Sequence, residues 1–139
     1  MDIEADILLV QAEAREARRT MDLLWGFEAG ARTYWCRDGI EALEFVFGTG
    51  RHWDRPEGYP KLVLLDADEP LLGGIEVLRR FRSSHAADAV RVAVLDAGPI
   101  EDRPHLGADR VIAKPLTVAT LERTLIEAGL AIDRLQEAL

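Results

Sequence analysis

The stretch from Lys61 to Pro70, KLVLLDADEP, decides the fold of this chain. Four consecutive apolar residues, Leu62 to Leu65, end abruptly in Asp66 and an acidic cluster. A short, wholly apolar run of this kind fits a strand that is covered on both faces, as in a parallel sheet. Because α/β sheets hold their chemistry beyond the carboxyl ends of their strands, Asp66 lies where a functional site is expected.

The rest of the chain alternates strand and helix signals around this strand. Apolar or β-forming runs predict strands at 7–10, 31–37, 62–65, 90–95 and 110–113. Amphipathic spacing predicts helices at 14–27, 40–47, 75–84 and 117–139. The apolar faces of the first and third are expected to include Trp25 and Ile75, respectively. Between the last two strands, Pro99 and Pro104 leave room for little more than one helical turn, so the fourth of five helices is shortened. Strict alternation predicts one three-layer, doubly wound α/β domain over residues 1–139, with a five-stranded parallel sheet.

Composition narrows the possible partners and compartments. The net charge of −8 and the pI near 4.9 oppose binding to nucleic acid, which requires clustered lysine and arginine. The basic residues Arg15, Arg18 and Arg19 are expected on a solvated face of the first helix, with docking to a kinase as the alternative. No apolar run approaches the ~20 residues that span a bilayer. The single cysteine, Cys36, cannot form an internal disulfide, and we expect a cytoplasmic protein.

The segment 48–60, GTGRHWDRPEGYP, carries three glycines and two prolines and is therefore predicted to be a loop. Its aromatic residues Trp53 and Tyr59 are expected to pack, on their own domain in preference to a partner. The histidines His52, His85 and His105 have no metal-ligand spacing and are expected at the surface.

The last predicted helix repeats apolar residues at alternating steps of four and three. This spacing is typical of a helix that pairs with another helix, so it motivates a homodimer hypothesis. The alternative is that the same face packs on its own sheet, and the sequence leaves the two open. The hypothetical dimer seam consists of Leu121, Leu125, Ala128, Ile132, Leu135 and Leu139.

Apolar strands that end in polar side chains, with a lysine opposite, resemble the CheY-like receiver domain of bacterial response regulators. The resemblance extends from ILLV at 7–10 through LVLLDADEP at 62–70 and GADRVIAKP at 107–115 to the last helix. The proline-containing loop before the third strand resembles the stand-alone regulators that are paired with phytochrome-type kinases. The family implies the flavodoxin-like strand order 2-1-3-4-5.

The resemblance also implies roles for individual residues. Asp66 falls where receivers accept a phosphoryl group from a kinase histidine, and Lys114 falls where a lysine pairs with that aspartate. Pro115 falls where the family has a cis peptide bond, a conformation that proline makes accessible. Asp68 falls where a backbone carbonyl binds Mg²⁺, and Glu69 is its neighbour.

The chain departs from the family at the metal site. Receivers have two acidic residues after the first strand, and this chain has Gln11 and Ala12. Mg²⁺ is usually held by one or two carboxylates together with phosphate and water, and here the first strand supplies none. Only Asp66 and Asp68 remain as candidate ligands, so we expect no metal cofactor.

The two switch positions differ as well. Asp96 replaces the Thr or Ser that hydrogen-bonds the phosphoryl group, and Val111 replaces the aromatic residue that swings inward on activation. Two carboxylates close together in a poorly solvated site repel each other. We therefore expect Lys114 to bridge Asp66 and Asp96 as a fixed network of ion pairs.

Three functions follow from these residues. The favoured one is an atypical, stand-alone receiver that works in two-component signalling by association with a histidine kinase or another signalling protein. The alternative is a conventional regulator that is phosphorylated on Asp66 and then requires Mg²⁺. A remote third possibility is a haloacid-dehalogenase-like phosphatase, because Asp66 and Asp68 follow an apolar strand, but Pro70 stands where that motif has Thr or Val. We therefore expect a protein that is not an enzyme.

Overall fold

The computed structural model describes residues 5–27, 29–56, 58–85, 87–98 and 107–130. Strands and helices alternate as predicted from β1 to β4, while the shortened helix predicted between β4 and β5 falls on 99–106, outside the described residues. The strands are β1 (Ile7–Val10), β2 (Thr33–Cys36), β3 (Leu62–Asp66), β4 (Arg91–Asp96) and β5 (Arg110–Ala113). The helices in the described residues are α1 (Ala14–Trp25), α2 (Gly39–Phe47), α3 (Gly74–Arg82) and α4 (Val118–Glu127). None of these helices is long and apolar enough to cross a membrane.

The five strands form one parallel sheet in the order β2-β1-β3-β4-β5, which confirms the flavodoxin-like prediction. The register pairs Val10 with Leu65 and Asp96 with Ala113. The carboxyl ends of β1, β3, β4 and β5 therefore meet at one edge of the sheet, where a site was expected.

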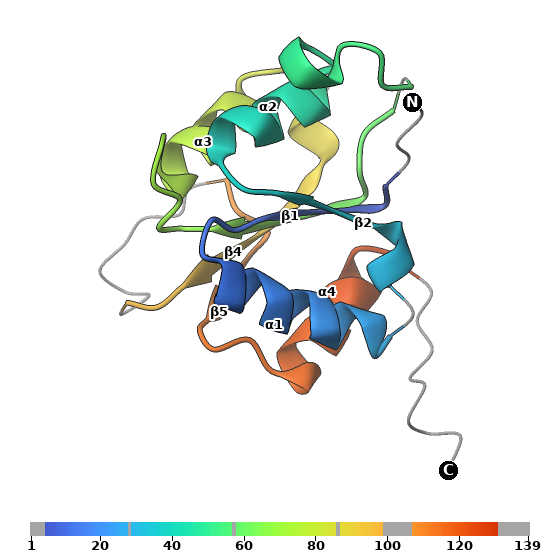
Figure 1. The fold of residues 1–139 in the computed structure, drawn as a ribbon, viewed down its shortest axis with the longest axis vertical. Coiled ribbons are helices and arrows are strands. Elements are labelled where there is room, and N and C mark those ends of the chain that lie inside the picture. The colour runs from blue at the N-terminus through green and yellow to red at the C-terminus, as the bar shows by residue number, and fades with distance from the viewer. Residues whose placement is uncertain (1–4, 28, 57, 86, 99–106, 131–139) are drawn as a thin grey trace.

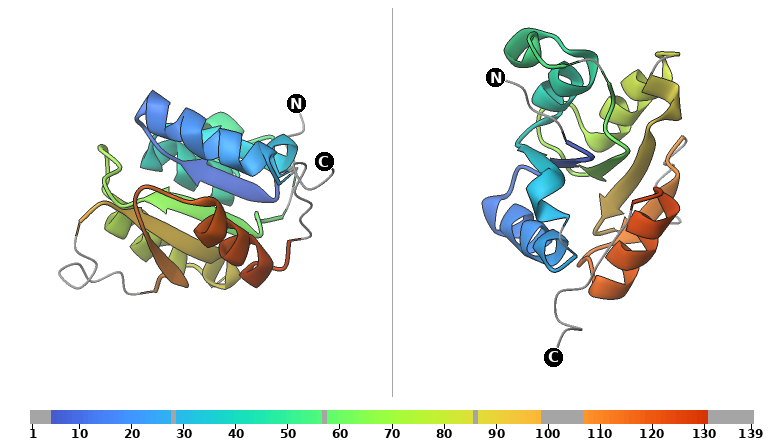
Figure 2. Two further views of the ribbon diagram at one scale, coloured as in Figure 1. Left: turned by 90° about the horizontal axis from the view of Figure 1, so that it is seen from below. Right: turned by 90° about the vertical axis from the view of Figure 1, so that its right-hand side faces the viewer.

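Helices cover both faces of the sheet (Figure 1): α2 and α3 lie on one side, and α1 and α4 lie on the other. Seen from below, α1 and α4 lie in front of the strands (Figure 2, left). Successive strand residues point to opposite faces, so Leu8 and Val10 pack under α2 and α3, whereas Ile7 and Leu9 pack under α1 and α4. Because both faces are covered, every residue of β1 is buried, which explains its continuous apolar sequence.

The last helix corrects the dimer hypothesis. Leu121 and Leu125 are fully buried in the core between α4 and the sheet, and Ala128 packs against the same core. The predicted seam is therefore wrong at the first two positions, because α4 needs its apolar stripe to cover its own sheet. The helix, predicted to continue to residue 139, stops at Glu127, and Gly129 follows with a φ of 76°. The remaining seam positions, Ile132, Leu135 and Leu139, lie outside the described residues.

The segment 48–60 corrects two further predictions. The expected packing on their own domain is wrong for Trp53, which is 75% exposed, whereas Tyr59 is 42% exposed and therefore more than half covered. His52 was expected at the surface, but it is buried. Its ring packs edge-on against Tyr34 and Phe45, and its Nε2 lies 3.0 Å from Glu41. His85 is exposed as predicted, and His105 lies outside the described residues.

Two helix faces are rotated slightly from the predicted ones. Trp25 was expected to face the core, but it is 51% exposed. Ile75 is likewise exposed, and Val77 takes the buried position beside Leu78 and Phe81 in α3. In both helices the ends of the apolar stripe were misplaced, while its centre was correct.

Candidate functional site

The strand ends enclose a cleft of about 400 Å³. Asp66 is the last residue of β3, and Lys114 directly follows β5, so the parallel register brings them to the same edge. The residues that line the cleft come from four strand ends and the first turn of α1: Ala12, Glu13, Glu16, Asp66, Asp68, Pro70, Ala97 and Lys114.

Asp66 is held at both carboxylate oxygens. Its Oδ2 accepts a hydrogen bond of 2.8 Å from the ammonium of Lys114, and its Oδ1 accepts one of 2.9 Å from the backbone N–H of Asp68. The residue is only 5% exposed. Paired, buried carboxylates of this kind are fixed in position, so Asp66 presents a preorganised acid to the cleft.

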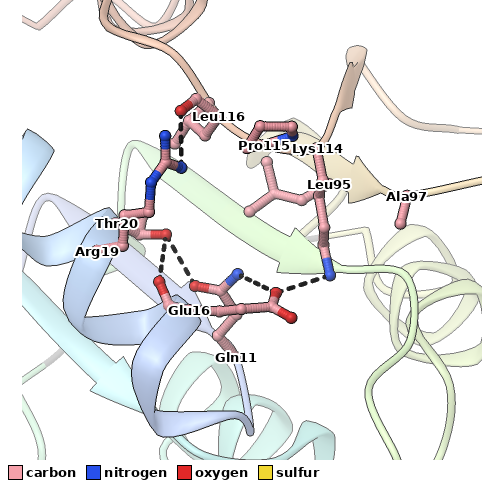
Figure 3. A pocket seen from close by; sticks show the side chains of 9 residues that line it. All are labelled: Gln11, Glu16, Arg19, Thr20, Leu95, Ala97, Lys114, Pro115 and Leu116. Carbon is pink, nitrogen blue, oxygen red and sulfur yellow. Dashed lines mark hydrogen bonds and ion pairs between the residues drawn. The ribbon is translucent and has the colours of Figure 1, made fainter.

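The second partner of Lys114 is Glu16, not Asp96 (Figure 3). The Lys114 ammonium donates to Glu16 Oε2 over 3.0 Å, which brings a carboxylate from α1 into the network. Asp96 is fully buried and turned back on its own loop, where its Oδ1 accepts the Gly98 N–H at 2.9 Å. The predicted bridge to Asp66 is therefore present, and the predicted bridge to Asp96 is replaced.

The surroundings of Lys114 favour its charged form. Burial alone would lower the pKa of the ammonium, but the hydrogen bonds and negative charges of Asp66 and Glu16 outweigh this effect. The net result is a pKa above the ordinary 10.5. Lys114 therefore stays protonated at physiological pH and acts as the resident cation of the cleft.

Gln11 points away from the cleft. Its Oε1 accepts a hydrogen bond of 2.9 Å from Thr20 Oγ1, and its Nε2 donates to Glu16 over 3.3 Å (Figure 3). Its backbone oxygen accepts the indole N–H of Trp35 at 2.7 Å. These contacts fix Gln11 against α1, so its side chain is absent from the lining of the Asp66 cleft.

The next two residues supply no free carboxylate either. Ala12 lines the cleft without an oxygen ligand. Glu13 caps α1, where its carboxylate accepts the backbone N–H groups of Arg15 at 3.1 Å and Glu16 at 2.8 Å. These hydrogen bonds lower the pKa of Glu13, which is their expected effect on a capping acid.

The residues present do not fit a Mg²⁺ site of the kind that receivers have. No cluster of three or more histidine, cysteine, aspartate or glutamate side chains in the described residues could hold a metal ion. Of the two candidate ligands, Asp66 already has both oxygens hydrogen-bonded, and Asp68 is an exposed residue at the rim. The cleft therefore holds a fixed ammonium where family members combine an acidic pair with a metal.

The other predicted positions lie around this centre. Glu69 is buried outside the cleft lining, and its carboxylate accepts the N–H groups of Leu71, Leu72 and Gly73 before α3. Val111 is half-buried on β5. The peptide bond between Lys114 and Pro115 is cis, as the resemblance implies.

Sequence reasoning missed Glu16 and Thr20. Glu16 lies at the edge of the buried stripe of α1, one residue before buried Ala17 and four before buried Thr20. A buried threonine one turn after a glutamate, next to a strand that ends in glutamine, is a weak signal of a polar network. Only the folded arrangement shows that this network reaches Lys114, which is 98 residues away in sequence.

The comparisons with known proteins agree with this geometry. No protein-family model matches the chain. The "Probable methanogenesis regulatory protein FilR2" of Methanothrix harundinacea is 30% identical over 125 residues, which are 87% of this chain and 79% of that protein.

Solved structures of phytochrome response regulators are also similar. The bacteriophytochrome response regulator AtBRR is 28% identical with a TM-score of 0.80, over 91% of this chain and 94% of its own. For the bacteriophytochrome response regulator RtBRR the identity is 27% and the TM-score 0.82, over 91% and 79%. The phosphorylated cyanobacterial phytochrome response regulator RcpA is 25% identical with a TM-score of 0.73, over 88% and 89%. These are regulators of the group that the loop at 48–60 resembles.

Proposed function

Because this chain belongs to the CheY-like receiver domains of response regulators, we propose that it acts in two-component signalling by protein association, without Mg²⁺-dependent phosphorylation of Asp66. Receiver domains are signalling modules that interact with histidine kinases. The similarity to phytochrome response regulators supports a kinase of the phytochrome type as the partner.

One observation carries this proposal: β1 offers the cleft no metal-binding carboxylate. Gln11 is bonded to Thr20 and Glu16, and Ala12 has no ligand atom. Glu16 and Asp66 are bonded to Lys114, and the Glu13 carboxylate accepts backbone N–H groups. A metal ion would have to displace these contacts.

The charge of the cleft points in the same direction. Among the described residues, its lining holds four acidic side chains, Glu13, Glu16, Asp66 and Asp68, and one cation, Lys114. A phosphoryl group adds a charge of about −1.5 to −2 at neutral pH. Without a divalent cation to offset this charge, its attachment to Asp66 is electrostatically opposed.

A conventional regulator phosphorylated on Asp66 is the second candidate. The observation that favours it is the retained pair of Asp66 and Lys114, with its distance of 2.8 Å. RcpA, a similar response regulator, has been crystallised in its phosphorylated form. The phosphatase alternative gains no support, because the similar solved structures named above are response regulators.

Metal binding separates the two candidates. Titration with Mn²⁺, followed by the electron paramagnetic resonance signal of the free ion, should show no saturable uptake by the wild-type protein. The variant Ala12→Asp adds a carboxylate to the exposed lining of the cleft and should bind Mn²⁺. Ala14→Asp adds the same charge outside the cleft lining and should behave like wild type.

Phosphorylation is then tested directly. Wild-type protein and Asp66→Asn are incubated with Mg²⁺ and acetyl phosphate, and their intact masses are measured. We expect no mass increase in either protein. A phosphoryl adduct on the wild type that is absent from Asp66→Asn, together with saturable Mn²⁺ uptake, would establish the conventional regulator instead.

A further inference from the structure

A second pocket lies beside the Asp66 cleft, on the side of the sheet covered by α1 and α4. Its volume is about 350 Å³, and it opens between α1 and the segment that follows β5 (Figure 3). The Glu16–Lys114 ion pair and Ala97 line both cavities, so this pair forms the wall between them. The remaining lining residues of the second pocket are Gln11, Arg19, Thr20, Leu95, Pro115 and Leu116.

The floor of this pocket is apolar. Leu95 on β4 and Leu116 after β5 are 1% and 3% exposed, and the ring of Pro115 lies beside them. The polar atoms of Gln11 and Thr20 are bonded to each other. Ligand pockets of proteins have this character, with a largely apolar wall and a few fixed polar groups.

Arg19 provides the charge at the mouth of the pocket. Its Nη1 donates to the backbone oxygen of Leu116 at 3.0 Å, which holds the guanidinium across the gap between α1 and the loop (Figure 3). Within the described part of the chain, no carboxylate forms an ion pair with Arg19, in contrast to Lys114, which has two. A guanidinium offers five N–H donors, so most of them remain for a ligand.

We propose that this pocket binds a small monocarboxylate with a compact apolar body. The carboxylate pairs with the Arg19 guanidinium, a geometry in which arginine binds strongly, and the body lies on Leu95, Pro115 and Leu116. A bound ligand lies against the Glu16–Lys114 ion pair, through which it can act on Asp66. Only this regulatory consequence rests on the proposed function. Binding itself does not rest on that function, so a negative result here leaves the Mn²⁺ experiment unaffected.

Benzoate is a suitable probe, with benzamide as its uncharged isostere. Titration of the ¹⁵N-labelled full chain should give saturable shifts with a Kd of about millimolar order, as expected for so few non-hydrogen atoms. The indole signal of Trp35 is the reporter, because this N–H is bonded to the backbone oxygen of Gln11 in the pocket wall. The exposed Trp53 lies on another segment and is the internal reference. Benzamide should shift neither signal saturably.

Variants assign the binding to this pocket. Arg19→Gln should weaken benzoate binding by at least about tenfold, since it removes a charged hydrogen bond. Arg18→Gln, also exposed on α1 but outside the lining, should keep the wild-type affinity. Glu16→Gln removes the negative charge nearest the ligand and should tighten binding by about two- to fivefold.

Three results would overturn the assignment. The first is the absence of saturable Trp35 shifts with benzoate in the wild type. The second is equal affinity in Arg19→Gln and Arg18→Gln. The third is benzamide binding as tightly as benzoate, since the pocket would then not select the carboxylate.

Discussion

Glu16 changes the character of the Asp66 site, because it gives Lys114 a second carboxylate. The ammonium has contacts of 2.8 Å to Asp66 and 3.0 Å to Glu16, and its side chain is 15% exposed. Its pKa is raised above 10.5, so the charged form stabilises the fold at every pH below that value. This contribution is lost as the pH rises through the higher pKa of the folded state.

Replacement of Glu16 by Gln should lower the pKa of Lys114, because one of the two acids that raise it is removed. The stabilising contribution of Lys114 is then smaller, and its alkaline loss is complete at a lower pH than in wild type. The chain has only two lysines, so ¹³C-labelled lysine gives one signal from Lys114 and one reference signal from the exposed Lys61. Asp22→Asn, exposed on the same helix, is the control. An unchanged pKa of Lys114 in Glu16→Gln would contradict the ion pair between Lys114 and Glu16.

At the scale of elements, the segment after α2 is fastened by two side chains. His52 packs edge-on against both Tyr34 and Phe45, which stack on each other, and it contacts Glu41 at the start of α2. Arg55 lies 4.2 Å over the Phe45 ring and donates to the Phe45 backbone oxygen at 2.7 Å. His52 and Arg55 hold the backbone of the segment 48–60 against α2, while the ring of Trp53 in the same segment stays in solvent.

His52→Ala should destabilise the protein by about 2 to 3 kcal/mol, since it leaves a cavity beside the stacked rings of Tyr34 and Phe45 and removes a polar partner of Glu41. Urea unfolding followed by circular dichroism measures this change. The matched control is His85→Ala, which alters an exposed histidine and should change the free energy of unfolding by less than about 0.5 kcal/mol. Equal effects of the two substitutions would show that His52 is not an anchor.

In the molecule as a whole, the apolar faces of the helices pack against the sheet, in one core on each of its two faces. The core under α1 and α4 takes in Leu121 and Leu125, the residues that spacing alone had offered to a dimer. The most exposed large apolar residue of this helix is Ile126, at 59%, followed by Val118 at its first position, at 37%. An association surface on α4 would therefore use the side of Ile126 and not the side of Leu125.

Leu125→Ala should lower the free energy of unfolding by about 2 to 5 kcal/mol, because it empties a fully buried position. Its sedimentation coefficient in native buffer should equal that of wild type. The adjacent substitution Ile126→Ala should change stability by less than about 0.5 kcal/mol. If Leu125→Ala left stability unchanged and sedimented as a smaller species than wild type, the result would support a dimer interface that includes Leu125.

Several features could be predicted from the sequence because they depend on local patterns. Apolar runs bounded by polar residues located all five strands, and β5 was placed at its observed residues. The parallel register then brought Asp66 and Lys114 together, as the resemblance implied. Helix faces were less accurate, since a stripe of four or five apolar residues leaves its edges undefined, as at Trp25 and Ile75.

The sequence by itself determined the α/β class, the edge of the sheet that carries the site and the loss of its acidic pair at Gln11 and Ala12. These follow from side-chain type and strand periodicity, which act over a few residues. Only the tertiary structure decided that Glu16, and not Asp96, completes the ion pairs of Lys114. The reason is geometric. Asp96 is bonded to its own loop, while the first turn of α1 brings Glu16 to the strand ends. No local sequence pattern encodes the distance between Glu16 and Lys114.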